Sequence, residues 1–234
     1  MFDPLQYTRT AFVLVIMLCM PAAPALAQTE WEEKTAVQAL IGASHFDSLI
    51  LDVPHSLDSS VTAGTEYTWM PLIGIAGQLP FRQTDTYAAG LEGSVIAGWR
   101  SKSVTVIGNN GTLSVYVDNS LLLLDLSMGL FLSTELGSAA RVYIGAGPLL
   151  MFGINDNDTR EVATDGSTRE RNHESSSAFG AGLYGRGGIE FRLADRSLMG
   201  VGVRAFSTRM DFDNVDDETS VRGIQFMITY TVGI

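Results

Sequence analysis

Cysteine is almost missing from this chain, which has only Cys19 among its 234 residues. Met17 and Leu18 before it are bulky, whereas a lipidated cysteine follows small residues, so we expect no lipid anchor at this position. The rest of the chain cannot form disulfides and has no thiol for catalysis or metal binding.

Long apolar runs are missing as well. Arg9 precedes a short apolar segment, Ala11–Met20, and Ala25-Leu26-Ala27 then has the small-x-small pattern of a signal peptidase site. This segment is shorter than the roughly 20 residues that a helix needs to cross a bilayer, and no longer apolar run follows it. We therefore expect residues 1–27 to be a cleaved signal peptide, residues 28–234 to form one domain, and no membrane helix.

Positive charge is scarce. The chain has 15 Lys and Arg residues against 26 Asp and Glu residues, which gives a formal net charge of −11. Because nucleic acids are themselves polyanions, we expect no nucleic-acid partner. We also expect no metal or cofactor, since the acidic segments have no calcium-loop spacing and the chain after residue 27 has no thiol ligand.

What the sequence does have is alternation with a period of two residues. From Ser177 to Leu193, apolar residues alternate with small, polar or charged residues, and successive side chains of a strand point to opposite faces. The same pattern recurs along the chain and predicts eight antiparallel strands. We place them near residues 36–46, 67–81, 87–107, 112–133, 141–154, 177–193, 199–210 and 221–234.

The predicted connections alternate in length. Thr134–Ala140 and Ala194–Leu198 are short, whereas Phe46–Glu66, Asn155–Ser176 and Asp211–Ser220 are long and polar. Short turns on one side and long loops on the other are typical of bacterial transmembrane β-barrels, whose strands need roughly 9–11 residues to cross a bilayer. Pro148 falls inside a predicted strand, where it cannot donate to the ladder, so we expect a bulge or a local gap in pairing there.

Three features favour an apolar face that points outward into lipid, rather than inward as in a soluble lipocalin. The other face is rich in Gly, Ser and Ala, which fit the narrow interior of an eight-stranded barrel. The apolar faces carry no charge, as expected where Lys or Arg costs about 2–4 kcal/mol at mid-membrane. Aromatic residues gather near both strand ends, where membrane interfaces favour them: Phe81, Tyr87, Phe191 and Tyr230 at one end, and Trp69, Trp99, Phe152 and Phe179 at the other.

With its signal segment, its alternating strands and its C-terminal strand Val221–Ile234, the chain resembles the small outer-membrane β-barrel family typified by OmpA, OmpX and OmpW. The resemblance implies an eight-stranded antiparallel transmembrane β-barrel in the outer membrane. It also implies contact with outer-membrane lipid and lipopolysaccharide, and with periplasmic chaperones and the barrel-insertion machinery during assembly. Members of the family usually end in an aromatic residue, and here the last residue is Ile234.

Charged residues of the inward parity form the first candidate site. One interpretation is a gate or a narrow ion path, and the other, which we favour, is a charge network that closes the barrel, since unpaired charge in a tight interior is costly. Pairing Leu193 with Met199 would place Arg204 opposite Gly188. The inward charged residues are Glu92, Arg100, Asp125, Arg141, Arg186, Glu190, Arg192 and Arg204.

Acidic residues of two external loops form a second candidate site. Carboxylate oxygens suit Ca²⁺ or Mg²⁺, which could bridge to phosphorylated lipid, but a solvated loop is the simpler interpretation. The residues are Asp156 and Asp158 in one loop, and Asp211, Asp213, Asp216, Asp217 and Glu218 in the other.

The third feature is a hairpin near residues 100–115, with Asn109-Asn110-Gly111 at its turn. Such a hairpin could bind an external protein by strand addition or could simply be a rigid loop. Of the three histidines, His45, His55 and His173, none has a sequence context that establishes a catalytic site. The favoured function is therefore a non-catalytic outer-membrane barrel for envelope integrity or surface interaction, with a narrow porin and a lipid-modifying enzyme as alternatives.

Overall fold

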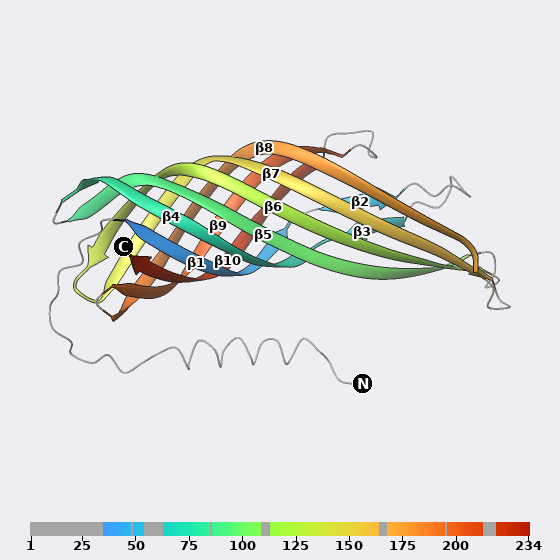
Figure 1. Cartoon of the computed structure of the whole chain (residues 1–234), viewed down its shortest axis with the longest axis horizontal. Coiled ribbons are helices and arrows are strands. Elements are labelled where there is room, and N and C mark those ends of the chain that lie inside the picture. Colours follow the sequence, from blue (N-terminus) through green and yellow to red (C-terminus); the bar gives the residue numbers. More distant parts are fainter. Residues whose placement is uncertain are drawn as a thin grey trace. The chain divides into compact units, whose positions relative to one another are not determined.

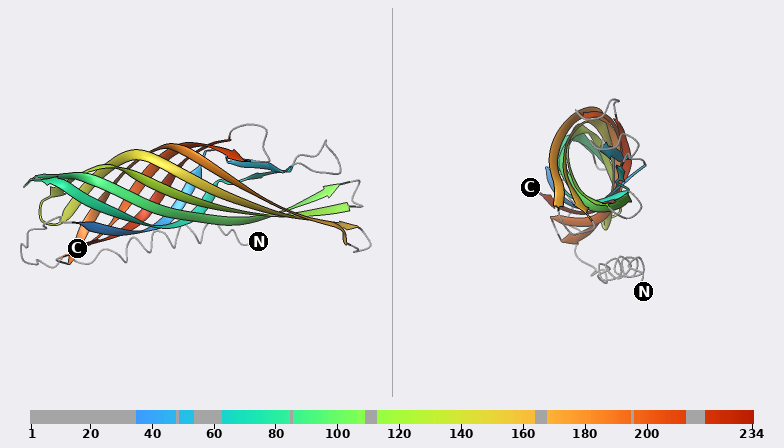
Figure 2. Two further views of the ribbon diagram at one scale, coloured as in Figure 1. Left: turned by 45° about the horizontal axis from the view of Figure 1, so that its top comes forward. Right: turned by 90° about the vertical axis from the view of Figure 1, so that its right-hand side faces the viewer.

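The computed structural model describes residues 35–47, 49–53, 63–84, 86–108, 113–163, 168–194, 196–212 and 219–234, so the predicted signal peptide lies outside it. Eight antiparallel strands close into a barrel, seen end-on in Figure 2. Around the ring they are β1 (Ala36–Phe46), β10 (Thr219–Gly233), β9 (Ser197–Phe212), β8 (Thr168–Ala194), β7 (Ala140–Ala163), β6 (Leu113–Leu136), β5 (Tyr87–Gly108) and β4 (Trp69–Gln83). No helix in the described residues is long and apolar enough to cross a membrane.

The eight predicted strands are confirmed, and two predicted connections need correction. The predicted loop Asn155–Ser176 is wrong, because β7 continues to Ala163 and β8 begins at Thr168. The connection Phe46–Glu66 contains a separate two-stranded hairpin, β2 (Ile50–Val53) with β3 (Ala63–Glu66). The reason for the first error is that β7 and β8 satisfy each other's backbone groups, which allows polar residues to continue the ladder. The predicted turn at Asn109–Gly111 lies outside the described residues.

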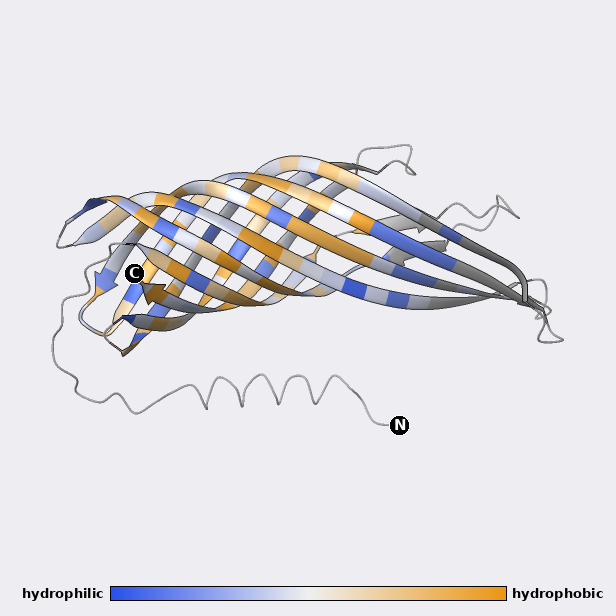
Figure 3. Ribbon diagram, viewed as in Figure 1, coloured by the Kyte–Doolittle hydropathy of each residue, from blue (hydrophilic) through white to orange (hydrophobic). Residues whose placement is uncertain are grey.

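The apolar face of the strands points outward, as predicted. Ile73, Leu130 and Leu183 are 65%, 60% and 68% exposed on the outer wall, whereas the alternate residues are buried in the lumen. In Figure 3 this appears as apolar and polar residues alternating along each strand. The aromatic residues predicted near the two strand ends also lie on the outer wall.

The turns at one end of the barrel are short, and we call this the short-turn end. Gly137, with a φ of 65°, occupies the turn between β6 and β7, in a left-handed conformation that residues with a Cβ rarely adopt. At the turn between β8 and β9 the register shifts between Arg192 and Ala194, so Met199 pairs with Phe191. The predicted pairing of Met199 with Leu193 is therefore wrong.

The expected irregularity at Pro148 is confirmed as a gap in pairing. The β6–β7 register lacks partners for two residues on each strand between the pairs Ser127–Leu149 and Leu130–Ala146. The backbones nevertheless stay close, because a Cβ on Gly147 would come within 2.5 Å of the Gly129 Cα. Two glycines thus keep the wall closed where the proline interrupts the ladder.

Candidate functional site in the barrel lumen

The lumen buries an equal number of opposite charges. Among the described residues, the buried arginines are Arg141, Arg186 and Arg204, and the buried carboxylates are Glu92, Asp125 and Glu190. Each arginine pairs with a different carboxylate, so these six charges sum to zero. A neutral, fully paired set is what a low-dielectric interior requires.

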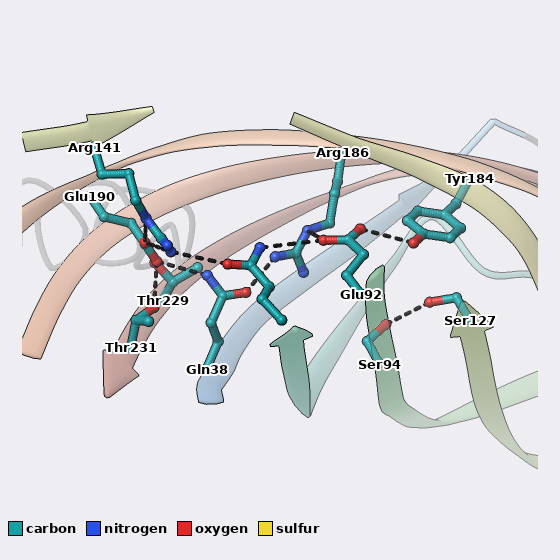
Figure 4. A network of polar contacts seen from close by, with 11 residues as sticks. Gln38, Glu92, Ser94, Ser127, Arg141, Tyr184, Arg186, Glu190, Thr229 and Thr231 are labelled. Atoms are coloured by element: carbon teal, nitrogen blue, oxygen red, sulfur yellow. Dashed lines mark hydrogen bonds and ion pairs between the residues drawn. The ribbon is translucent and has the colours of Figure 1, made fainter. Parts of the chain in front are cut away.

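Glu190 is the centre of the contacts nearest the short-turn end (Figure 4). Arg141 Nη2 lies 2.6 Å from Glu190 Oε2, and Gln38 Nε2 donates to Glu190 Oε1 over 2.9 Å. The hydroxyls of Thr229 and Thr231 donate to the same oxygen over 2.8 and 2.6 Å. Several charge-assisted donors thus hold one carboxylate that has no access to water.

Glu92 is the second centre. Arg186 Nε lies 3.3 Å from Glu92 Oε2, and the Tyr184 hydroxyl donates to Glu92 Oε1 over 2.8 Å. Gln78 connects the two centres, since its amide nitrogen lies 3.4 Å from Glu92 Oε2 and its oxygen accepts from Arg141 over 3.2 Å. We call this set the lumen network; it comprises Gln38, Gln78, Glu92, Arg141, Tyr184, Arg186, Glu190, Thr229 and Thr231.

A third charge pair lies beside the lumen network. Arg204 Nη1 and Nη2 lie 2.5 and 2.9 Å from the two oxygens of Asp125, so the contact is bidentate. Arg204 also donates to Gln225 over 2.8 Å, and its guanidinium carbon lies 4.6 Å from the centre of the Tyr184 ring. Bidentate pairing and stacking on an aromatic ring are the contacts that suit a guanidinium better than an ammonium.

Glycines provide the space for the large polar side chains of the lumen. A Cβ on Gly202 would lie 2.7 Å from the Tyr143 hydroxyl, and a Cβ on Gly145 would lie 2.3 Å from Glu92 Oε1. Tyr143 is 1% exposed and carries the Arg186 guanidinium 4.9 Å from its ring centre. The glycines on the inward parity are therefore sites where a side chain from another strand fits.

An apolar cluster fills the lumen toward the end opposite the short turns. The sequence analysis missed it, although large apolar residues at inward positions, such as Leu121 and Met151, were a signal for it. We call it the apolar plug; its buried members are Phe46, Leu49, Tyr67, Met70, Leu121, Leu123, Leu149, Met151, Ala178, Tyr184, Phe206, Met210 and Val221.

Two members of the apolar plug come from outside the barrel strands. Leu49 and Tyr67 flank the β2–β3 hairpin and are 1% and 0% exposed, and the Tyr67 amide donates to the Leu49 carbonyl over 2.8 Å. The Tyr67 hydroxyl donates to Asn119 over 2.9 Å. Burial raises the pKa of Tyr67 to about 12, so the phenol remains a neutral donor at physiological pH.

The structure brings six of the eight predicted lumen residues together and places the other two elsewhere. Arg100 is half-buried and donates to the Trp69 carbonyl. Arg192 is half-buried near the short turns, 3.6 Å from Glu135. The sequence analysis also missed the uncharged partners of these charges, Gln38, Gln78 and Gln225. Their inward-facing positions in the alternating pattern were a signal that could have identified them.

The predicted cation-binding residues are not gathered into a site in the described part of the chain. Asp156 and Asp158 lie on β7 rather than in a loop, and Asp211 lies near the end of β9. No group of three or more His, Cys, Asp or Glu side chains in the described ranges is arranged to hold a metal ion. Four other residues of the prediction lie outside these ranges: Asp213, Asp216, Asp217 and Glu218.

The histidines are similarly dispersed. His45 packs edge-on against Trp69, with ring centres 4.6 Å apart. His173, which we expected in a loop, is exposed on β8, where it pairs with Asp158 of β7. His55 lies outside the described residues.

Four neighbouring strands extend beyond the rest of the barrel (Figure 1). Beyond Gly98, β5 pairs only with β6, and before Ala178, β8 pairs only with β7. We call this four-stranded part the extension; it comprises residues 99–108, 113–122, 154–163 and 168–177. In the described residues no barrel strand pairs with the outer side of either outer strand, and we call these two sides the open edges.

Comparison with known proteins identifies similar barrels. The family model for the outer membrane protein beta-barrel domain matches residues 10–231. The solved structure of OprG from Pseudomonas aeruginosa is 13% identical with a TM-score of 0.40, and the match covers 86% of this chain and 96% of that one. Ail from Yersinia pestis, in complex with the heparin analogue sucrose octasulfate, is 13% identical with a TM-score of 0.36, covering 86% and 99%. No curated protein sequence matches the chain.

Proposed function

Because this chain belongs to the outer membrane protein β-barrel family and lies in the outer membrane, we propose that it is a non-catalytic barrel that binds external protein through its extension. The observation that carries the proposal is the unequal length of the strands. β5, β6, β7 and β8 have 22, 24, 24 and 27 residues, whereas β1 and β4 have 11 and 15. A strand needs roughly 9–11 residues to cross a bilayer, so the extra length serves a purpose outside it.

The two open edges of the extension differ in sequence. The β8 edge carries alternating charges, with Arg169, Glu170 and Arg171 among its residues, and such charges prevent strand addition. The β5 edge reads Val104-Thr105-Val106-Ile107, an uncharged segment with high β propensity. An extended segment of an external protein would therefore add to β5, where main-chain hydrogen bonds supply affinity.

The channel alternative receives less support from the lumen. A path for ions would have to cross both the lumen network, in which opposite charges are paired, and the apolar plug. Wide transmembrane barrels conduct because side chains do not fill their interiors, whereas an eight-stranded barrel has room only for side chains.

The enzyme alternative also lacks support in the described residues. A hydrolase needs a base beside a nucleophile, oriented by a third group. His45 instead contacts an aromatic ring, and His173 is exposed on a strand.

The test is to shorten each hairpin of the extension at matched pairs. Val106 pairs with Val115, and Glu161 pairs with Glu170, so replacing the ten residues 106–115 or 161–170 by Asn-Gly shortens the chain by eight residues without changing the register. We expect cells that produce the 106–115 variant to lose adhesion to surfaces coated with extracellular matrix protein, while the 161–170 variant adheres normally. A heat-dependent gel shift checks that each barrel is folded. Equal adhesion of the two variants and the parent would contradict the proposal.

A further inference from the structure

Two exposed arginines lie side by side on the outer wall of the barrel, apart from the lumen and the extension. Arg209 of β9 and Arg222 of β10 are exposed, and each alternates with buried residues, which fixes its outward direction. The register pairs Arg209 with Ser220 and Ser207 with Arg222. Two guanidinium groups and two exposed hydroxyls thus occupy the corners of a square on neighbouring strands, which we call the arginine–serine patch.

The aromatic residues of the outer wall fix the height of the patch. On β10, Phe226 is the second outward-facing residue after Arg222. It packs against Trp69, with ring centres 6.2 Å apart. On the other side, exposed Phe179 of β8 pairs with Asp211, which lies two residues beyond Arg209 along β9. The patch therefore lies between aromatic residues that mark the outer membrane interface, at the depth of lipid headgroups.

Among the side chains that the structure describes, neither arginine of the patch, Arg209 or Arg222, has a partner. The nearest carboxylate by register is Asp47, which is exposed and whose amide donates to the Arg222 carbonyl over 3.1 Å. The two guanidinium groups are thus free to bind an anion that comes from the membrane.

The outer wall next to the patch, on its membrane side, has small side chains. On β9, the next outward-facing residue after Ser207 toward the membrane is Ala205. It pairs with Gly185 of β8, and both residues are exposed. A Cβ on Gly185 would meet no atom within 4 Å, and the neighbouring Leu183 is 68% exposed. The outer surface beside the patch is thus formed by small residues next to a projecting leucine, and it carries no charge there.

We propose that the arginine–serine patch binds a phosphate group of a phosphorylated lipid in the outer leaflet of the outer membrane, with an acyl chain along Gly185 and Ala205. Planar guanidinium groups bind phosphate oxygens in pairs, and the serine hydroxyls add further donors. The lipid, rather than soluble phosphate, is the ligand because the site lies at the interface and borders uncharged, small residues of the outer wall. This inference does not depend on the proposed role of the extension.

The experiment measures binding of bisphosphorylated lipid A to the refolded full barrel in detergent by native mass spectrometry. The test variant is R209Q/R222Q, and the matched control is R82Q/R196Q, which removes two exposed arginines near the short-turn end. We expect the test variant to bind about 30-fold more weakly, the equivalent of about 1 kcal/mol per arginine, and the control to bind like the parent. A heat-dependent gel shift establishes that every variant is folded.

Three further measurements make the result specific. Lipid A without phosphates should bind the parent as weakly as bisphosphorylated lipid A binds R209Q/R222Q, and inorganic phosphate at matched concentration should not displace the lipid. The D47N variant should bind more tightly, since it removes the neighbouring negative charge. Equal losses in the two double variants, or equal binding of both forms of lipid A to the parent, would overturn the proposal.

Discussion

Arg186 and Arg204 lie directly opposite each other in the β8–β9 pair, and both are buried in the lumen. Like charges at opposed positions repel, so this arrangement depends on the carboxylates that reach across the barrel. Glu92 of β5 pairs with Arg186, and Asp125 of β6 pairs with Arg204. The two ion pairs thus connect strands that are three places apart in the ring of eight.

The first prediction concerns the Arg204–Asp125 pair. Arg204→Met alone should destabilise the barrel by about 3–5 kcal/mol, because it leaves the Asp125 carboxylate buried without its partner. The double variant R204M/D125L should recover most of this loss, since it removes both charges. Urea unfolding in detergent micelles, followed by tryptophan fluorescence, measures the two changes. A single variant as stable as the parent would show that Asp125 finds another partner or water.

The second prediction concerns the fit of Tyr143 against Gly202. Gly202→Ala should cost about 1–3 kcal/mol, because the new methyl group would lie 2.7 Å from the Tyr143 hydroxyl. Y143F removes that oxygen, so G202A/Y143F should be more stable than G202A alone. The same urea unfolding measures both variants. If Y143F does not relieve the loss, the cost of the alanine comes from the backbone rather than from the tyrosine.

The third prediction concerns conductance. The parent barrel should be silent in a planar bilayer, because the lumen network and the apolar plug are two barriers in series. The variant Y67A/L121A should open only the apolar plug, and R141A/E190A should open only the lumen network, so each double variant should remain silent. The variant that combines all four substitutions should conduct. Discrete channels from the folded parent would contradict the closed lumen and favour the porin alternative.

The fourth prediction concerns stability at high pH. The pKa of Tyr67 is about 12 in the folded barrel, above the ordinary value of 10, so the unfolded chain loses this proton first. The contribution of the neutral phenol is fully present below pH 10 and is lost as the pH rises to about 12. The free energy of unfolding of the parent should therefore fall relative to Y67F across this interval, as measured by urea titrations at several pH values. A constant difference would mean that Tyr67 ionises alike in both states.

The local sequence predicted the strands and the direction of their faces because both follow from a period of two residues. The residues near 36–46 and 221–234, for example, form the strands β1 and β10. The inward charges could be named for the same reason, since Glu92, Asp125 and Glu190 occupy positions that alternate with apolar residues. The full length of β7 and β8 could not be predicted from the sequence. Polar residues such as Asp156 and Ser175 form strand there only because they pair with each other.

What the sequence determined by itself is therefore the barrel and its orientation toward lipid, both of which depend on contacts between neighbours along the chain. Only the tertiary structure decided which charges meet. The register of the β8–β9 pair places Arg204 opposite Arg186 instead of Gly188, and closure of the ring brings Asp125 within reach. The apolar plug likewise required the β2–β3 connection to fold back, so that Leu49 and Tyr67 became buried. Such contacts join residues from strands far apart in the chain, and their identity depends on register and closure, which no local pattern encodes.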